Sequence, residues 1–211
     1  WRLVFVTRAR GARRGLANAD EVERALRRLS EAGVADVTYT DFSSGVEVAA
    51  QWRLAAGADV LAGPHGAGLA WGAFMAEGRV LVELMPHLRA LRPELCRGTG
   101  WDSTPMYAYG GLGAAAGLRH LCLVGRADAG EAEAPASLAR ELGSWIAAPV
   151  RVDVRALTAV LGRALRYLDA ERAAGRLRGG SGPGESSETQ TTRGRGRGMG
   201  RIEFGTERVG A

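Results

Sequence analysis

The sequence contains no lysine, since all 28 of its basic residues are arginines. No property of a solvated surface excludes every lysine, so we interpret this absence, together with the many Ala, Leu and Val residues, as a compositional bias of the source genome. The formal net charge of +5 is therefore weak evidence for a nucleic-acid partner. Arginine is nevertheless the better bidentate ligand for phosphate groups.

Cysteine and long apolar runs are also scarce. Cys96 and Cys122 have no metal-type spacing, and one possible pair does not define a disulfide scaffold, so the redox compartment is not determined. No apolar run reaches the ~18 residues of a membrane span, so no membrane anchor is visible in this sequence. The start does not resemble a signal peptide. Because the chain begins at Trp1 in a strand-like run, without an initiator Met, we expect it to be a piece of a longer protein.

The remaining composition is that of an ordinary globular protein. The 211 residues are 46% hydrophobic and 24% charged, which is enough for one domain with a substantial core. We expect a Rossmann-like domain over residues 1–126, followed over residues 127–175 by a linker and C-terminal helices that pack on it. The Gly, Ser, Thr and Arg content of residues 176–211 predicts a disordered tail.

Apolar periodicity predicts alternating strands and helices over the first half of the chain. Capping-box spacings at Asn18 with Glu21 and at Ser44 with Glu47 predict two helix starts, and a third helix follows Gly68. The expected strands cover residues 2–7, 37–42, 59–62, 79–85, 106–109 and 120–124, and two later helices cover residues 138–146 and 157–168. The expected apolar face of the second helix contains Val48, Trp52 and Ala55. This order predicts an α/β fold with a parallel sheet and helices on both faces.

Residues 63–69, Gly-Pro-His-Gly-Ala-Gly-Leu, lie at one of the predicted strand-to-helix turns. Glycines let a backbone come close to another group, and the first amides of the following helix carry partial positive charge. Such a turn is typical of an anion site, most often one for a diphosphate. His65 adds a side chain that can donate a hydrogen bond or carry charge near neutral pH. The alternative is a tight glycine turn with a buried, hydrogen-bonded histidine.

Charged side chains at or after three predicted strand ends are expected at the same sheet edge, because the strands are parallel. Arg8 and Arg14 would clamp a diphosphate and stabilise charge on a leaving group; the alternative is a solvated basic loop. Glu83 is either an acceptor for a ribose or sugar hydroxyl or an ordinary strand-end carboxylate. Asn18 and Glu21 are expected to cap a helix rather than to bind a ligand.

The ordered set of these motifs resembles glycosyltransferase family 61. This family includes protein O-linked mannose and extracellular O-linked N-acetylglucosaminyltransferases and plant xylosyl- and arabinosyltransferases. The resemblance covers roughly the first 125 residues, and the position that we assign to Arg14 is open to Arg13 as an alternative. The motifs are, in order, Arg8, Arg14, Glu21, Gln51, the turn His65-Gly66-Ala67-Gly68-Leu69, Phe74, Glu83 and Pro86. Trp71 stands where the family usually has a polar residue.

The resemblance implies the C-terminal, donor-binding half of a GT-B enzyme. It implies inverting transfer of a sugar from a UDP-sugar to a hydroxyl of a protein or polysaccharide. The acceptor half would lie in a preceding domain, and the enzyme would act in the Golgi or endoplasmic reticulum lumen. The catalytic residues would be His65 and Arg14, although the base is equally open to a residue of the missing half. The donor would contact Arg8, Arg14, His65, Gly66, Ala67, Gly68 and Glu83.

No cofactor is expected beyond the donor substrate. The sequence has no Asp-x-Asp motif, so we expect arginines and helix amides to do the work of a metal ion. Trp101, Asp102 and Tyr107 are candidates for the edge of the base site. One alternative function is a non-catalytic nucleotide-binding module. Another is an RNA-associated protein that acts through the Arg-Gly repeats of residues 193–198, although nucleic acid is not an expected partner.

Overall fold

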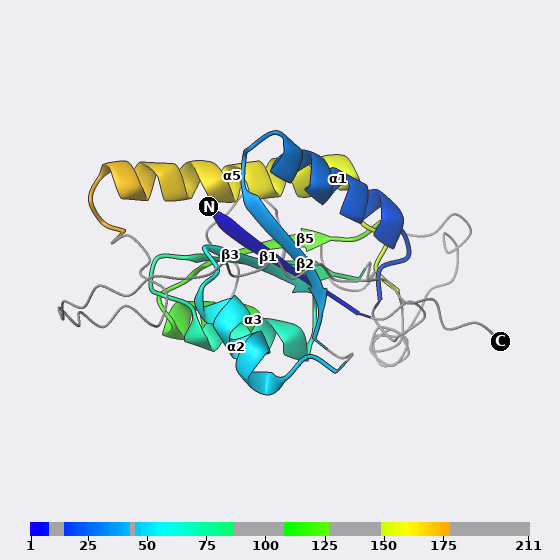
Figure 1. Cartoon of the computed structure of the whole chain (residues 1–211), viewed down its shortest axis with the longest axis horizontal. Helices are drawn as coiled ribbons and strands as arrows, with labels where there is room; N and C mark the ends of the chain where they lie inside the picture. The colour runs from blue at the N-terminus through cyan, green and yellow to red at the C-terminus, as the bar shows by residue number, and fades with distance from the viewer. Residues whose placement is uncertain (9–14, 43–44, 87–107, 127–148, 178–211) are drawn as a thin grey trace, which may run out of the picture.

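The computed structural model describes residues 1–8, 15–42, 45–86, 108–126 and 149–177. Its centre is a sheet of five parallel strands in the order β2-β1-β3-β4-β5 (Figure 1). The strands are β1 Arg2–Thr7, β2 Asp36–Asp41, β3 Val60–Pro64, β4 Val80–Met85 and β5 Arg119–Val124. The expected α/β fold with a Rossmann-like parallel sheet is confirmed.

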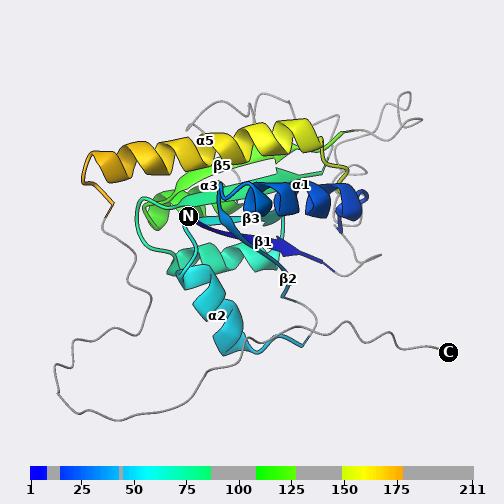
Figure 2. The same cartoon turned by 45° about the horizontal axis from the view of Figure 1, so that its top comes forward.

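Helices cover both faces of this sheet (Figures 1 and 2). On one face lie α1, Ala19–Glu31, and α5, Val154–Ala173; on the other lie α2, Val48–Ala56, the 3-10 helix η1, Ala67–Phe74, and α3, Ala108–Ala115. The split follows from strand order, because right-handed crossovers change face when the chain reverses direction across the sheet. Here β2 is added on one side of β1 and β3 on the other. The reversal places a topological switch point between β1 and β3, where ligands of such sheets bind.

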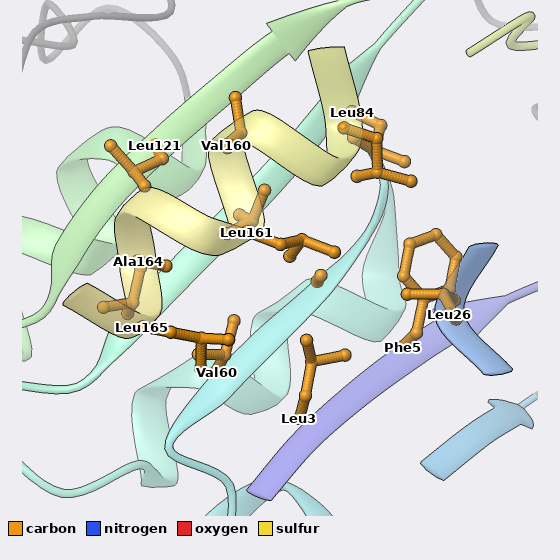
Figure 3. Close-up of a cluster of buried hydrophobic side chains, with 14 of the residues drawn as sticks. Leu3, Phe5, Leu26, Val60, Leu84, Leu121, Val160, Leu161, Ala164 and Leu165 are labelled. Carbon is orange, nitrogen blue, oxygen red and sulfur yellow. The ribbon is translucent and has the colours of Figure 1, made fainter. Parts of the chain in front are cut away.

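Side chains of successive strand residues enter the two cores alternately, as the period of a strand requires. Leu3 and Phe5 of β1 pack beneath α1 and α5, where they contact a cluster that includes Leu26 and Leu161 (Figure 3). Val4 of the same strand faces the layer of α2 and η1. Because both faces are buried, the central strands read as continuous apolar runs. The expected helix over residues 157–168 lies within α5, whose leucines complete the first core.

Two sequence-based predictions about elements are wrong, and a third is refined. The expected strand at 106–109 runs into α3, which begins at Ala108, while residues 106–107 lie outside the described part. The helix expected after the histidine turn is present as a 3-10 helix, in which the Leu69 amide donates to the Gly66 carbonyl at 2.9 Å. On α2, only Ala55 of the expected face is buried, whereas Val48 is 68% exposed and Trp52 37% exposed. The predicted helix at 138–146 falls outside the described residues.

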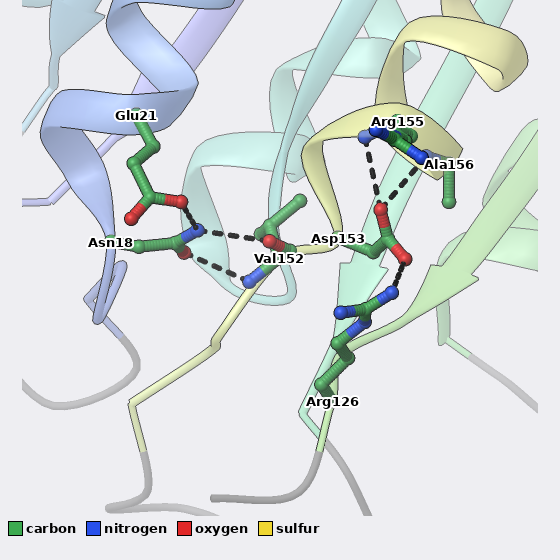
Figure 4. A network of polar contacts seen from close by, with 7 residues as sticks. All are labelled: Asn18, Glu21, Arg126, Val152, Asp153, Arg155 and Ala156. Atoms are coloured by element: carbon green, nitrogen blue, oxygen red, sulfur yellow. Dashed lines mark hydrogen bonds and ion pairs between the residues drawn. The ribbon is translucent and has the colours of Figure 1, made fainter.

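Asn18 is the N-cap residue of α1, as expected, but the capping box is not formed, because its side chain bonds Glu21 and a distant segment instead of a backbone amide of the helix. Its Oδ1 accepts a hydrogen bond from the Val152 amide at 2.9 Å, and its Nδ2 donates to the Val152 carbonyl at 2.9 Å and to Glu21 at 3.0 Å (Figure 4). A parallel bridge between Leu16 and Val150 lies next to these bonds. Asn18 therefore joins the start of α1 to the segment that precedes α5.

The cap of α5 is made by Asp153, whose carboxylate accepts hydrogen bonds from the backbone amides of Arg155 and Ala156 (Figure 4). The same carboxylate pairs with Arg126, which follows β5. The hydrogen bond from the Ala156 amide is the main cause that keeps the pKa of Asp153 below its ordinary value. The second predicted capping box is not formed, since Glu47 precedes α2 without a side-chain cap, and Ser44 lies outside the described residues. Among the helices that the structure describes, none is long and apolar enough to cross a membrane.

We expect Asn18→Ala to lower the free energy of unfolding by about 1–3 kcal/mol, because it leaves buried polar groups of Val152 without their partner. Urea unfolding measures the change. Arg27→Ala is the control, since Arg27 forms an exposed pair with Glu23 on the same helix, and such pairs contribute at most about 1 kcal/mol. Equal losses in the two variants would contradict the role assigned to Asn18.

Candidate functional site

A cavity of about 270 Å³ opens at the carboxyl ends of β1, β2 and β3, next to the switch point. It combines one cation, one carboxylate, two aromatic rings and the glycine turn. The lining residues are Val6, Thr7, Arg8, Asp41, Phe42, Gln51, Pro64, Ala67, Gly68 and Trp71. Position in the sheet and chemical character both mark this cavity as the candidate ligand site.

Arg8 lies across the histidine turn, and Gly66 makes this approach possible. An ideal Cβ on Gly66 would overlap Nη2 of Arg8 and lie 3.1 Å from its Cζ. A side chain at this position would therefore displace the guanidinium. The turn thus places a permanently charged, five-donor group beside the cavity.

The other two glycines of the turn bring it close to β1. A Cβ on Gly63 would overlap the Val6 carbonyl oxygen, and one on Gly68 would lie 2.7 Å from Cγ1 of Val6. The sequence suggested that these glycines admit a ligand, yet in the structure their immediate neighbour is the adjacent strand. Their first role is to hold the carboxyl end of β3 and the start of η1 against β1.

His65 follows β3 and is held on three sides. Its amide donates to the Leu84 carbonyl at 2.8 Å, and its ring packs edge-on against Tyr109, with the ring centroids 5.2 Å apart. The Tyr109 hydroxyl donates to the Gly66 carbonyl at 2.6 Å. Nδ1 of His65 contacts Oε1 of Glu83. These contacts fix both the turn and the orientation of the imidazole.

Glu83 of β4 is fully buried between two histidines. Its second oxygen, Oε2, bonds Nε2 of His120 on β5 at 2.9 Å, so each carboxylate oxygen has an imidazole partner. Burial alone raises the pKa of Glu83, but the hydrogen bonds from His120 and His65 outweigh it, and the pKa lies below its ordinary value of 4.5. Glu83 is therefore an anion at neutral pH. A carboxylate on Nδ1 selects the tautomer of His65 whose Nε2 can accept a proton.

This geometry changes the interpretation of Glu83. A fully buried carboxylate with two imidazole partners is neither an ordinary strand-end residue nor well placed to reach a hydroxyl of a ligand. It is instead placed to act through His65. His120, to which the sequence analysis assigned no role, is its second partner. The signal was present in the alternation of β5, where His120 falls on the face opposite the buried Leu121.

Gln51 organises the side of the cavity away from the turn. Its Nε2 donates to the carbonyls of Phe42 and Val46 at 3.0 and 2.8 Å, and its Oε1 accepts from the indole of Trp71 at 3.1 Å. Its hydrogen-bonding groups are thus used inside the protein. Gln51 supports Phe42 and Trp71 rather than a ligand.

Most of the sequence-predicted site residues meet at this edge. Arg8, Ala67 and Gly68 line the cavity, His65 and Gly66 lie beside it, and Glu83 lies beneath His65. Further candidates lie outside the described residues: Arg14, its alternative Arg13, Trp101, Asp102 and Tyr107. The part of the chain that the structure describes holds no group of three or more His, Cys, Asp or Glu residues suited to a metal ion.

Two further cavity residues, at the end of β2, are not among the site residues predicted from the sequence. Asp41 lies opposite Thr7 in the parallel register, and Phe42 follows it. Both residues line the cavity. Their position at the end of a predicted strand was a usable signal, but the sequence does not tell that β2 and β3 flank β1 on opposite sides.

One family model matches part of this chain. Residues 1–82 match the model of Glycosyltransferase 61. The matched segment contains β1, β2, β3, Arg8 and the turn of His65. The resemblance to glycosyltransferase family 61 is thereby confirmed over these residues, and it supports a glycosyltransferase that uses a sugar donor and an acceptor. No curated protein matches the chain.

Glu83→Gln should lower the free energy of unfolding at neutral pH by about 2 kcal/mol, because charge-assisted hydrogen bonds to both histidines are lost. Because the pKa of Glu83 is lower in the folded state, its ionised carboxylate stabilises the protein at pH values above the ordinary pKa of 4.5. This stabilisation is lost as the pH falls through the folded-state pKa. The difference between wild type and variant should therefore shrink in acid.

Urea unfolding at neutral pH and at several values below 4.5 measures this difference. Glu23→Gln, which removes an exposed carboxylate on α1, is the control. A wild-type advantage that stays constant across the whole pH range would show that Glu83 does not stabilise the fold as an anion.

Proposed function

We propose that this chain is the donor-binding half of an inverting glycosyltransferase, which moves a sugar from a UDP-sugar to a hydroxyl of a protein or polysaccharide. The observation that carries the proposal is the placement of Arg8 across Gly66 beside a cavity at the switch point of the sheet. The family match over the same residues supports the reaction class.

The diphosphate of the donor is assigned to Arg8 and the turn formed by Gly66, Ala67 and Gly68. A guanidinium binds phosphate oxygens in pairs and keeps its charge at every physiological pH. Arg14 is proposed as a second cation that stabilises the UDP leaving group. As the bond between sugar and phosphate breaks, negative charge grows on this diphosphate, and fixed positive groups lower the energy of that state.

His65 is proposed as the general base. The acceptor oxygen attacks the anomeric carbon, the bond to the diphosphate breaks with its electrons staying on UDP, and the hydroxyl proton goes to Nε2 of His65. The buried carboxylate of Glu83 would hold the imidazole in the tautomer that this step needs and stabilise its protonated form. A residue of the acceptor half remains the alternative base.

The acceptor site would lie in a preceding domain of a GT-B architecture. Arginines and backbone amides would neutralise the diphosphate without a required metal or other cofactor. Enzymes of family 61 typically act in the secretory pathway, so the proposed compartment is the lumen of the Golgi or endoplasmic reticulum.

Arg8→Ala should weaken binding of UDP to this chain by about 10- to 100-fold, because hydrogen bonds to charged groups contribute about 1.5–3 kcal/mol. Gly66→Ala should have a similar effect, since its Cβ would push the guanidinium aside. Isothermal titration calorimetry with UDP measures both.

Gly162→Ala is the matched control, because this glycine lies on α5, away from the cavity. If Arg8→Ala binds UDP as tightly as the wild type does, the assignment of the diphosphate to Arg8 is wrong. Loss of affinity in the control as well would indicate a general defect of folding.

Arg14→Ala and His65→Ala should each lower kcat about 10²-fold or more, since one removes charge stabilisation and the other a base. Release of UDP from a UDP-sugar, in the longer protein that contains the acceptor half, measures turnover. Arg27→Ala is the control. An unchanged kcat in either variant would exclude that residue from the catalytic role assigned to it.

A further inference from the structure

We infer that the cavity at the ends of β1, β2 and β3 is the nucleoside subsite, in which Asp41 accepts a ribose hydroxyl and Phe42 and Trp71 contact the base. This inference rests on the proposed function, because it takes the ligand to be a nucleotide sugar. It adds Asp41, Phe42 and Trp71 to the residues proposed to contact the donor.

The position of Asp41 points to a ribose. Asp41 is the last residue of β2, lies opposite Thr7 at the end of β1, and lines the cavity together with Arg8. An ionised carboxylate only accepts hydrogen bonds, so the ligand group that binds to it must be a donor, such as a hydroxyl, and not a phosphate. In doubly wound sheets an acidic residue that follows the second strand commonly binds the ribose of a nucleotide.

The aromatic part of the lining is held in place before any ligand binds. Gln51 accepts from the indole of Trp71 and donates to the Phe42 carbonyl, so one side chain positions both residues. Phe42 packs on Gly68 of η1, where an added Cβ would lie 3.9 Å from its ring. Fixed aromatic faces bind nucleobases by stacking, and a site that is already ordered loses little entropy on binding.

The size of the cavity sets how much of the donor it can hold. At about 270 Å³ it lies just below the roughly 300–1,000 Å³ of pockets that enclose a whole drug-sized ligand. A nucleoside fits this scale better than a complete nucleotide sugar. Arg8 lines the cavity and also lies against Gly66. The diphosphate of the bound donor would therefore extend from the nucleoside in the cavity toward Arg8 and Gly66. The sugar would then lie outside, toward His65.

The test compares paired variants for binding of UDP, ADP and GDP by calorimetry. Asp41→Asn is paired with Asp36→Asn, which alters an exposed carboxylate at the other end of β2. Trp71→Ala is paired with Trp52→Ala on α2, and Trp71→Phe tests whether an aromatic face is enough. Thermal unfolding followed by circular dichroism checks that each variant is folded.

We expect Asp41→Asn and Trp71→Ala each to weaken binding about tenfold, with Trp71→Phe closer to wild type and both controls unchanged. The 2′-deoxy and 3′-deoxy forms of UDP supply a sharper readout. At least one should bind less well than UDP to the wild type, and that penalty should disappear in Asp41→Asn, because the missing hydroxyl then has no carboxylate partner.

The outcomes separate this inference from the proposed function. If UDP binds and depends on Arg8, but the Asp41 and Trp71 variants match their controls, the nucleoside subsite is wrong and the donor assignment stands. If ADP or GDP binds through Asp41 and Trp71 while UDP does not, the subsite is supported and the UDP donor is wrong. If no nucleoside diphosphate binds to the folded wild type, both are overturned.

Discussion

The close approach of the turn after β3 to the end of β1 is the constraint on which the rest of the site depends. At Gly63 and Gly66 an added Cβ would overlap the Val6 carbonyl and the Arg8 guanidinium. Because these positions carry no side chain, two parallel strands and a 3-10 helix meet closely at the switch point. The same steric condition brings Arg8 to Gly66, beside the cavity that Arg8 and the turn line together.

A buried anion supports this arrangement from below. Glu83 is fully buried, and its charge is tolerated because two histidines bond its oxygens. The contact with His65 links the middle of β4 to the turn after β3. Packing and polar contacts thus both hold the turn after β3. A substitution of Glu83 would alter the orientation of His65 even though Glu83 itself does not contact a ligand.

The fold could be predicted from the sequence because its signals are local. Alternation of strands and helices follows from apolar periodicity, and the parallel sheet follows from that alternation. The glycine turn was recognised by composition, with Arg8, His65 and Glu83 placed at one edge. The apolar face of α2 was predicted wrongly, since Val48 and Trp52 lie on its exposed side and only Ala55 is buried.

By itself the sequence determined the α/β class and the edge of the sheet at which charged residues meet. These depend on periodicity and on parallel strands, which are properties of short segments. Only the tertiary structure decided that Asn18 bonds Val152, that His120 shares Glu83 with His65, and that Asp41 lines a cavity with Trp71. Each of these relations joins residues from different elements, and their distance is set by strand order and packing, which no local pattern encodes.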